Sequence, residues 1–126
     1  MARARPIRVL IADDQRPFAA MLETTLADHE DVEVVGRAAN GQEAVDLAAE
    51  LEPDVVLMDI TMPVLDGLEA TRRIRATDSS TRILVLTESD LRSDAVRAER
   101  AGAHGYVPKT RIVGRLRAAI LEAAGH

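Results

Sequence analysis

The chain has 126 residues, 47% of them hydrophobic but only 2% aromatic, and a net charge of −5. This length fits one domain whose core must be built from aliphatic side chains. Because there is no cysteine, disulfides, thiolate catalysis and cysteine-based metal sites are excluded. The sequence also lacks an apolar run of about 18 residues, so no membrane contact is expected, and its acidic balance disfavours direct binding of nucleic acid.

The first six residues are basic but lead into no apolar stretch of the kind that directs secretion. We therefore expect residues 1–6 to form a disordered tail and residues 7–126 to form the domain. A chain without cysteine and without a signal sequence is expected in the cytoplasm.

In the first half of the chain, short apolar runs alternate with helical patterns. The runs cover residues 7–12, 32–38 and 55–58. Pro17 suits the first turn of a helix after the first run, and Asn40 with Glu43 resembles a capping box that opens the next helix. The third run leads through a loop with Pro63 and Gly67 into a third helix.

The same alternation continues in the second half. A fourth run at residues 83–86 precedes a helix at about residues 90–101, which is poor in large apolar side chains. Gly102 is expected to end this helix. A short fifth run at residues 105–107 precedes a last helix, which Thr110 is expected to cap.

Five strands that alternate with five helices predict an α/β fold with a parallel sheet covered on both faces. The first, third and fourth runs are almost continuously apolar, as doubly covered central strands are. The second run carries Glu33 and Arg37 and the fifth is short, so both are expected at the edges. The predicted fold is a flavodoxin-like (βα)5 doubly wound parallel sheet with strand order 2-1-3-4-5.

Charged and hydroxyl residues follow the ends of these strands. They are Asp13 and Asp14 after the first run, Asp59 after the third, Thr87 after the fourth and Lys109 after the fifth. Because parallel strands share one carboxyl rim, and ligands bind there at the switch point in strand order, we expect these groups to meet. Lys109 is the one lysine among 16 basic residues, which favours a position that needs a compact ammonium.

Three carboxylates that meet in this way repel one another unless a cation joins them. Oxygen ligands without His or Cys suit Mg²⁺, with Mn²⁺ as the alternative, and Mg²⁺ is commonly shared with a phosphate. Lys109 and Thr87 would contact phosphoryl oxygens, and a carboxylate can be the nucleophile that forms an aspartyl phosphate. Taken singly, Asp13 or Asp14 is as well explained by a helix cap and Asp59 by a turn, so the hypothesis depends on their joint placement.

Five segments together resemble the receiver domains of bacterial two-component response regulators. They are residues 9–14, 53–63, 66–67, 83–87 and 101–109. These segments occur in the family's order and cover nearly the whole chain. The Ala-Gly-Ala-x-Gly-Tyr pattern at residues 101–106 is most similar to the NarL/FixJ-like branch.

The resemblance implies a role for each matching residue. The metal ligands would be Asp13, Asp14, Asp59 and the backbone carbonyl of Thr61. Asp59 would be the phosphoacceptor, Lys109 and Thr87 would bind the phosphoryl group, and Thr87 with Tyr106 would form the conformational switch. The donor would be a sensor histidine kinase, and the domain would catalyse only its own phosphorylation and dephosphorylation.

The resemblance also implies how the signal leaves the domain. The readout would lie on the face of the fourth helix, fifth strand and fifth helix, where a homodimer is a candidate. Val113, Arg117 and Leu121 are expected to point outward there. Nothing after the last helix remains to act as an output domain, so we expect either a stand-alone receiver or one whose DNA-binding, transcription-regulating domain lies outside this chain.

Two positions near the expected site, Glu88 and Thr110, depart from the family's usual pattern. A third, Thr61, is expected to affect the reaction. Glu88 stands where a small residue usually follows the threonine, so we expect it to slow phosphorylation or to bias the choice of donor. Thr61 is expected to tune dephosphorylation by water. Thr110 stands where a proline often follows the lysine, which disfavours a cis-proline at that turn.

Two other functions remain open from the sequence alone. A pseudo-receiver would be an interaction module that is not phosphorylated, although all five key residues are present. A Mg²⁺-dependent phosphatase of the haloacid-dehalogenase type would also form an aspartyl phosphate, but it would need a second acid where Thr61 stands.

Overall fold

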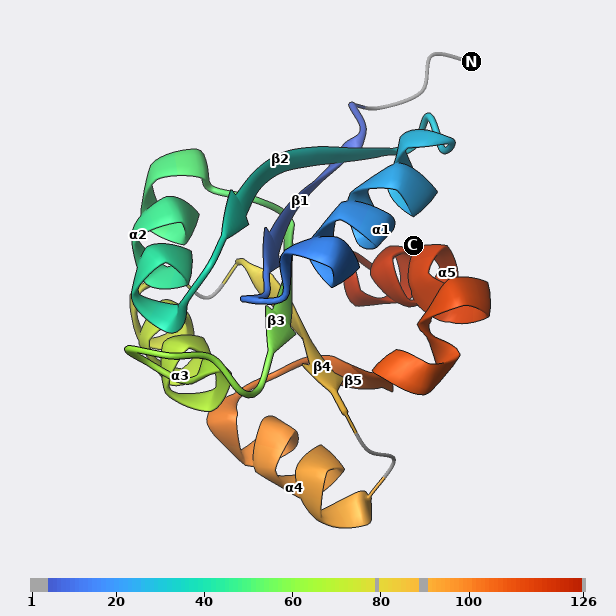
Figure 1. Cartoon of the computed structure of the whole chain (residues 1–126). Helices are drawn as coiled ribbons and strands as arrows, with labels where there is room; N and C mark the ends of the chain where they lie inside the picture. Colours follow the sequence, from blue (N-terminus) through green and yellow to red (C-terminus); the bar gives the residue numbers. More distant parts are fainter. Residues whose placement is uncertain (1–4, 79, 89–90, 126) are drawn as a thin grey trace.

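The computed structural model describes residues 5–78, 80–88 and 91–125, which form a five-stranded parallel sheet flanked by helices (Figure 1). The elements are β1 (Ile7–Ala12), α1 (Arg16–Ala27), β2 (Val32–Ala38), α2 (Gly41–Leu51), β3 (Val55–Asp59), α3 (Gly67–Thr77), β4 (Arg82–Thr87), α4 (Arg92–Ala101), β5 (Gly105–Pro108), the 3₁₀ turn η1 (Lys109–Arg111) and α5 (Ile112–Ala123). The strand order is β2-β1-β3-β4-β5. The predicted flavodoxin-like fold and its strand order are confirmed.

Each face of the sheet has its own core. In β1, Val9 and Ile11 pack on the side of α1 and α5, whereas Leu10 and Ala12 pack on the side of α2, α3 and α4. Figure 1 shows these two groups of helices on opposite sides of the sheet. Because successive side chains of a strand point to opposite faces, a strand covered on both faces must be apolar throughout.

The two edge strands are β2 and β5, as predicted. The pairing of β1 with β2 contains a bulge, because Val9 lies opposite Val34 but Leu10 lies opposite Gly36. The pairing of β1 with β3 has no such shift and runs continuously to the end of β1. The irregularity is therefore confined to the edge of the sheet.

Local signals set several helix ends. Asn40 caps α2, since its side-chain oxygen accepts the N–H of Glu43 at 2.9 Å, and the Glu43 carboxylate accepts the N–H of Ala39 at 2.9 Å. Pro17 lies in the first turn of α1. Gly102 ends α4 with a φ of 102°, a left-handed conformation that glycine adopts without strain. These three predictions are confirmed.

The predicted cap of the last helix is wrong. Thr110 lies inside η1, and Arg111 is the N-cap of α5, without a side-chain capping bond. The chain tightens here because the N–H of Ile112 bonds the carbonyl of Lys109. A 3₁₀ turn at the start of a helix takes over the role that a capping side chain would have.

The predicted outward surface of α5 is only partly correct. Val113 is 75% exposed. Arg117 is also exposed, but its guanidinium pairs with both carboxylate oxygens of Asp31, just before β2. Leu121 packs, partly buried, against the core beneath α5, so the expectation that it points outward is wrong.

Two predicted boundaries touch residues outside the described part of the chain. Residues 1–4 of the predicted tail lie there, whereas Arg5 donates to both carboxylate oxygens of Asp54. Asp90, the predicted start of the fourth helix, also lies there, and α4 is described from Arg92.

Among the described helices, none has the length and apolar character needed to cross a membrane.

The loop that leaves β3 is clamped to the end of the strand. The N–H of Gly67 donates to the carbonyl of Ile60 at 2.7 Å, and the N–H of Ile60 donates to the carbonyl of Leu86 at 3.2 Å. A Cβ atom on Gly67 would lie only 1.9 Å from the carbonyl oxygen of Asp59. The start of α3 therefore rests directly on the backbone that carries Asp59.

We expect Gly67→Ala to destabilise the domain, because the methyl group fits only if β3 or α3 moves. Overpacking of this kind costs roughly 1–3 kcal/mol. Gly114→Ala in α5 is the matched control, since nothing beyond its chain neighbours and the backbone of its own helix lies within 4 Å of the position its Cβ would take. That change should stabilise the helix by up to about 1 kcal/mol. Urea denaturation measures both effects, and a Gly67→Ala variant as stable as wild type would contradict the predicted clash.

Candidate functional site

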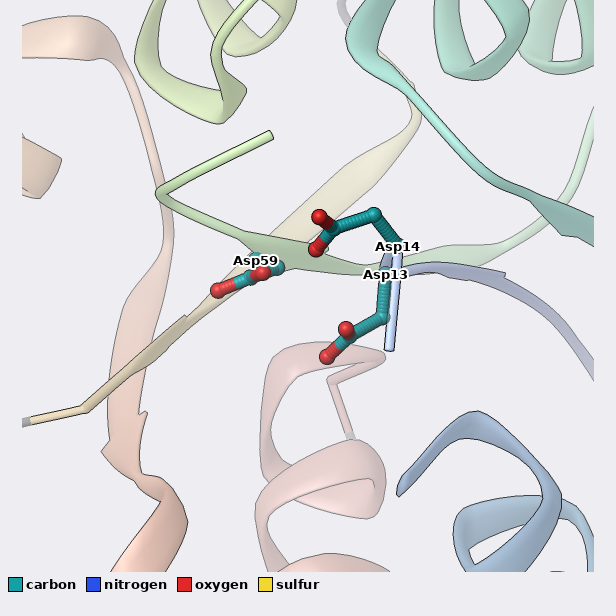
Figure 2. A group of neighbouring side chains, drawn as sticks. All are labelled: Asp13, Asp14 and Asp59. Atoms are coloured by element: carbon teal, nitrogen blue, oxygen red, sulfur yellow. The ribbon is translucent and has the colours of Figure 1, made fainter. Parts of the chain in front are cut away.

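The three acids predicted to meet lie together at the carboxyl rim of the sheet. Asp13 and Asp14, after β1, and Asp59, at the end of β3, each offer an oxygen within 4.8 Å of the others (Figure 2). Asp13 and Asp59 are each 3% exposed, whereas Asp14 is exposed. The group is therefore a largely buried acidic cluster with one solvent-facing member.

The register of the sheet explains this convergence. The pairs at the rim are Ala12 with Met58, Asp59 with Leu86, and Thr87 with Pro108. Asp13 directly follows Ala12 and so begins at the level of Asp59, whereas Lys109 begins two residues beyond Val107, which is level with Asp59 through Leu86. The positions of the charged groups are thus set by backbone hydrogen bonds between strands and not by long loops.

Asp13 divides its two carboxylate oxygens between the backbone and the lysine. Oδ1 accepts the N–H of Gln15 at 2.8 Å, in the turn that leads into α1. Oδ2 lies 2.8 Å from Nζ of Lys109. Gln15 occupies the N-cap position of α1, so neither Asp13 nor Asp14 is the helix cap.

The ammonium of Lys109 is surrounded by oxygens. Its Nζ lies 2.8 Å from Asp13 Oδ2, 3.2 Å from Gln15 Oε1, 3.3 Å from Glu88 Oε1 and 3.6 Å from Asp59 Oδ1. The lysine side chain is only 7% exposed. Burial lowers the pKa of Lys109, but Asp13, Asp59 and Glu88 outweigh it and raise the pKa above its ordinary value, so the group stays charged.

Asp59 is the acid whose ionisation is most perturbed. Burial, and after it the charge of Asp13, raises the pKa of Asp59 from 3.8 to about 7, although Lys109 opposes this shift. A hydrogen bond from the backbone N–H of Thr61 also lowers the pKa, but by less. One ammonium does not balance three carboxylates, so the cluster lacks positive charge.

The donor set fits a hard divalent cation. Three converging carboxylates without His or Cys suit Mg²⁺, and also Mn²⁺. A divalent ion would relieve the repulsion that raises the pKa of Asp59. The carbonyl of Thr61 stays a predicted fourth ligand. With such an ion in place, the Asp59 carboxylate has the charge environment that a nucleophile toward a phosphoryl group needs.

The two residues predicted to form a switch lie on neighbouring strands. Thr87 ends β4 and is 1% exposed, and Tyr106 is half-buried on β5. Tyr106 borders a cavity of about 140 Å³ on the side of Ala95 and Ala98 in α4, and another of about 380 Å³ on the side of α5. The tyrosine has room to move on either side, and its switching role stays a prediction.

Two partners of the lysine were not foreseen from the sequence. The ring of Phe18 lies with its centroid 4.4 Å from Nζ of Lys109, and the side-chain oxygen of Gln15 accepts a hydrogen bond from that ammonium. Glu88, expected only as an obstacle to a donor, also pairs with the lysine. Gln15 is the N-cap of α1, and Phe18 lies three residues further on, in the first turn of that helix. That spacing was visible in the sequence, but it is equally typical of ordinary core packing.

Comparison with known proteins agrees with this geometry. Residues 9–121 match the family described as response regulator receiver domain. The nitrate/nitrite response regulator protein NarL of Escherichia coli is 35% identical over 109 residues, which cover 86% of this chain and 50% of NarL. A protein-glutamate methylesterase/protein-glutamine glutaminase of Nocardioides sp. is 41% identical over 110 residues, which cover 86% of this chain and 30% of that protein. The chain thus spans half or less of these two relatives.

A solved structure shows the same fold over the whole domain. The signal receiver domain of NarL from Mycobacterium tuberculosis superposes with a TM-score of 0.92 at 30% sequence identity, covering 98% of this chain and 100% of that one. The five-stranded parallel sheet and its strand order therefore belong to a known architecture. The chain is a member of the response regulator receiver domains of two-component systems, of the NarL/FixJ-like type.

Proposed function

We propose that Asp59 accepts a phosphoryl group from a phosphohistidine of a sensor histidine kinase in a Mg²⁺-dependent reaction. The observation that carries this proposal is the convergence of Asp13, Asp14 and Asp59 beside the buried ammonium of Lys109. A carboxylate oxygen of Asp59 attacks phosphorus, the P–N bond to the donor imidazole breaks, and its electron pair stays on the imidazole.

Each of the surrounding groups has a part in this transfer. Asp13, Asp14, Asp59 and the carbonyl of Thr61 would hold Mg²⁺, which supplies positive charge to phosphoryl oxygens when bound. Lys109 neutralises a further phosphoryl oxygen, and the buried hydroxyl of Thr87 donates a hydrogen bond to the group. Asp59 is buried, whereas Asp14 and Glu88 are exposed, so we expect a donor to approach past these two acids.

The phosphoryl group then shifts a conformational equilibrium. It favours the state in which Thr87 lies closer to Asp59, and Tyr106 moves into the space that this leaves. The α4–β5–α5 face, where Val113 is exposed, carries the change to an output domain, another protein or a second copy of this chain. Because the NarL relative is longer, we propose that a DNA-binding output domain joined to this receiver regulates transcription.

Intact mass spectrometry after incubation with acetyl phosphate and Mg²⁺ tests the proposed function. Wild type should gain one phosphate, EDTA should prevent the gain, and Asp59→Asn should gain none. Absence of phosphate on wild type would instead favour an interaction module that is not phosphorylated. Steady hydrolysis of a generic phosphomonoester would favour a phosphatase.

The raised pKa of Asp59 predicts a pH-dependent stability in the absence of metal. Between pH 3.8 and about 7 the folded protein keeps a proton on Asp59 that the unfolded chain has released, so the free energy of unfolding falls as the pH rises through this window. Asp59→Asn has no carboxyl group at this position, so its free energy of unfolding does not fall in this way. In EDTA at pH 8 it should therefore be more stable than wild type by on the order of 2 kcal/mol, and by less at pH 5.

Urea denaturation at the two pH values measures this difference. Saturating Mg²⁺ should reduce the advantage of Asp59→Asn at pH 8, because the ion neutralises the carboxylate of wild type. An advantage that is the same at both pH values would contradict the raised pKa.

Glu88 is the third carboxylate beside the lysine, after Asp13 and Asp59, and its side chain is 63% exposed. We propose that it competes with the phosphoryl group for Lys109 and repels anionic donors. Glu88→Gln should then speed phosphorylation by acetyl phosphate about 2–5-fold, since an exposed ion pair is worth roughly 0.2–1 kcal/mol. Glu99→Gln, at an exposed position of α4, is the matched control. Unchanged rates with both acetyl phosphate and the kinase as donors would remove this role from Glu88.

A further inference from the structure

The Lys109 ammonium has more acceptors around it than it has hydrogens to donate. An ammonium carries three N–H bonds, and its three nearest oxygens belong to Asp13, Gln15 and Glu88, at 2.8, 3.2 and 3.3 Å. The oxygen of Asp59 lies further away, at 3.6 Å. Without a phosphoryl group, the lysine is therefore held beside the acceptor acid and not directly on it.

The ring of Phe18 covers a further side of the ammonium. Its centroid lies 4.4 Å from Nζ, within the distance at which an aromatic face attracts a cation. Phe18 is half-buried near the start of α1 and packs against the core beneath that helix. Because the lysine side chain is only 7% exposed, water screens this attraction less than it would at an open surface.

The partners of the ammonium differ in charge and in attachment. Gln15 and Phe18 are neutral and belong to the start of α1. Glu88 is an exposed carboxylate that follows the end of β4. A phosphoryl group on Asp59 would displace the anionic partners of the ammonium before the neutral ones. Of the anionic partners, Glu88 is the exposed one, so water can replace its contact with the lysine at the least cost. The neutral pair on α1 can stay in contact with the lysine before and after phosphorylation.

We propose that Phe18, assisted by Gln15, is a positioning residue that holds the Lys109 ammonium at the edge of Asp59, where a phosphoryl oxygen captures it. This inference rests on the proposed function, in which Lys109 binds the phosphoryl group, and it adds the α1 side of the site. The contact that Phe18 makes is with the Lys109 ammonium, so it acts on the site through the lysine. Without the ring of Phe18, the Lys109 side chain can adopt further rotamers in which its ammonium lies in water. Binding of a phosphoryl group must then order the lysine side chain again, at a cost in conformational entropy.

Proton NMR tests the resting contact without metal or donor. Lys109 is the only lysine in the sequence, so its ε-methylene signals can be assigned without overlap from other lysines. The ring of Phe18 should shift these signals from their ordinary position. Phe18→Leu, which keeps apolar bulk but has no aromatic face, should abolish the shift, and Phe18→Tyr should preserve it. Signals that Phe18→Leu leaves unchanged would overturn the inference.

Affinity for fluoroberyllate, a mimic of the phosphoryl group, tests the positioning in the presence of Mg²⁺. Phe18→Leu should weaken binding about 3–10-fold, as expected for loss of a partly desolvated cation–π contact. Phe18→Tyr should stay within about twofold of wild type, because it restores the aromatic face. Met21→Ala is the matched control, since Met21 lies about one turn further along α1 and packs against the same core.

The outcomes separate the inference from the function on which it rests. If wild type binds fluoroberyllate and Phe18→Leu binds it equally well, only the role of Phe18 is overturned. If Met21→Ala weakens binding as much as Phe18→Leu, the effect is one of packing and the role of Phe18 is also overturned. If wild type takes up neither fluoroberyllate nor phosphate, the proposed function fails and the inference fails with it. Thermal melting of each variant establishes that it is folded.

Discussion

The Lys109 ammonium lies among carboxylate oxygens from three segments of the chain, and the electrostatics of the whole rim depend on this one buried cation. Asp13 and Asp59 are almost completely buried, and carboxylates so placed strongly disfavour the charged state unless a cation accompanies them. One lysine offsets this cost only in part, which is why Asp59 still holds its proton up to about pH 7. The same shortage of positive charge that weakens the metal-free domain gives the rim a donor set that suits a divalent ion, which in the proposed function would also favour a phosphoryl group.

Most of the fold and much of the site could be predicted from the sequence, because both follow from burial. Strands covered on both faces have to be apolar throughout, so β1, β3 and β4 were recognisable as central, and Glu33 and Arg37 marked β2 as an edge. Once the strand order is known, residues that follow the strands must share one rim. This reasoning placed Asp13 and Asp59 side by side without any knowledge of side-chain conformation.

The features that escaped prediction depend on a local tightening of the backbone or on packing between segments far apart in the sequence. Thr110 is a good capping residue by type, but the chain tightens into η1 and Arg111 takes the N-cap position. Leu121 was assigned to the outer surface, although the packing of α5 on the sheet turns it partly inward. The contact of Phe18 with Lys109 joins residues 91 positions apart, and the local pattern around Phe18 indicates only an amphipathic helix.

The bulge between β1 and β2 has a consequence for how this sequence can change over evolutionary time. The extra residue on β2 is absorbed at the edge of the sheet, while the continuous ladder between β1 and β3 keeps Asp13 level with Asp59. One residue inserted into β1 or β3 would displace an acid by about 3.3 Å and turn its side chain to the opposite face. Insertions and deletions should therefore be tolerated on the β2 side and eliminated by selection in the two central strands. The lengths of β1 and β3 should then vary less during evolution than their amino-acid composition.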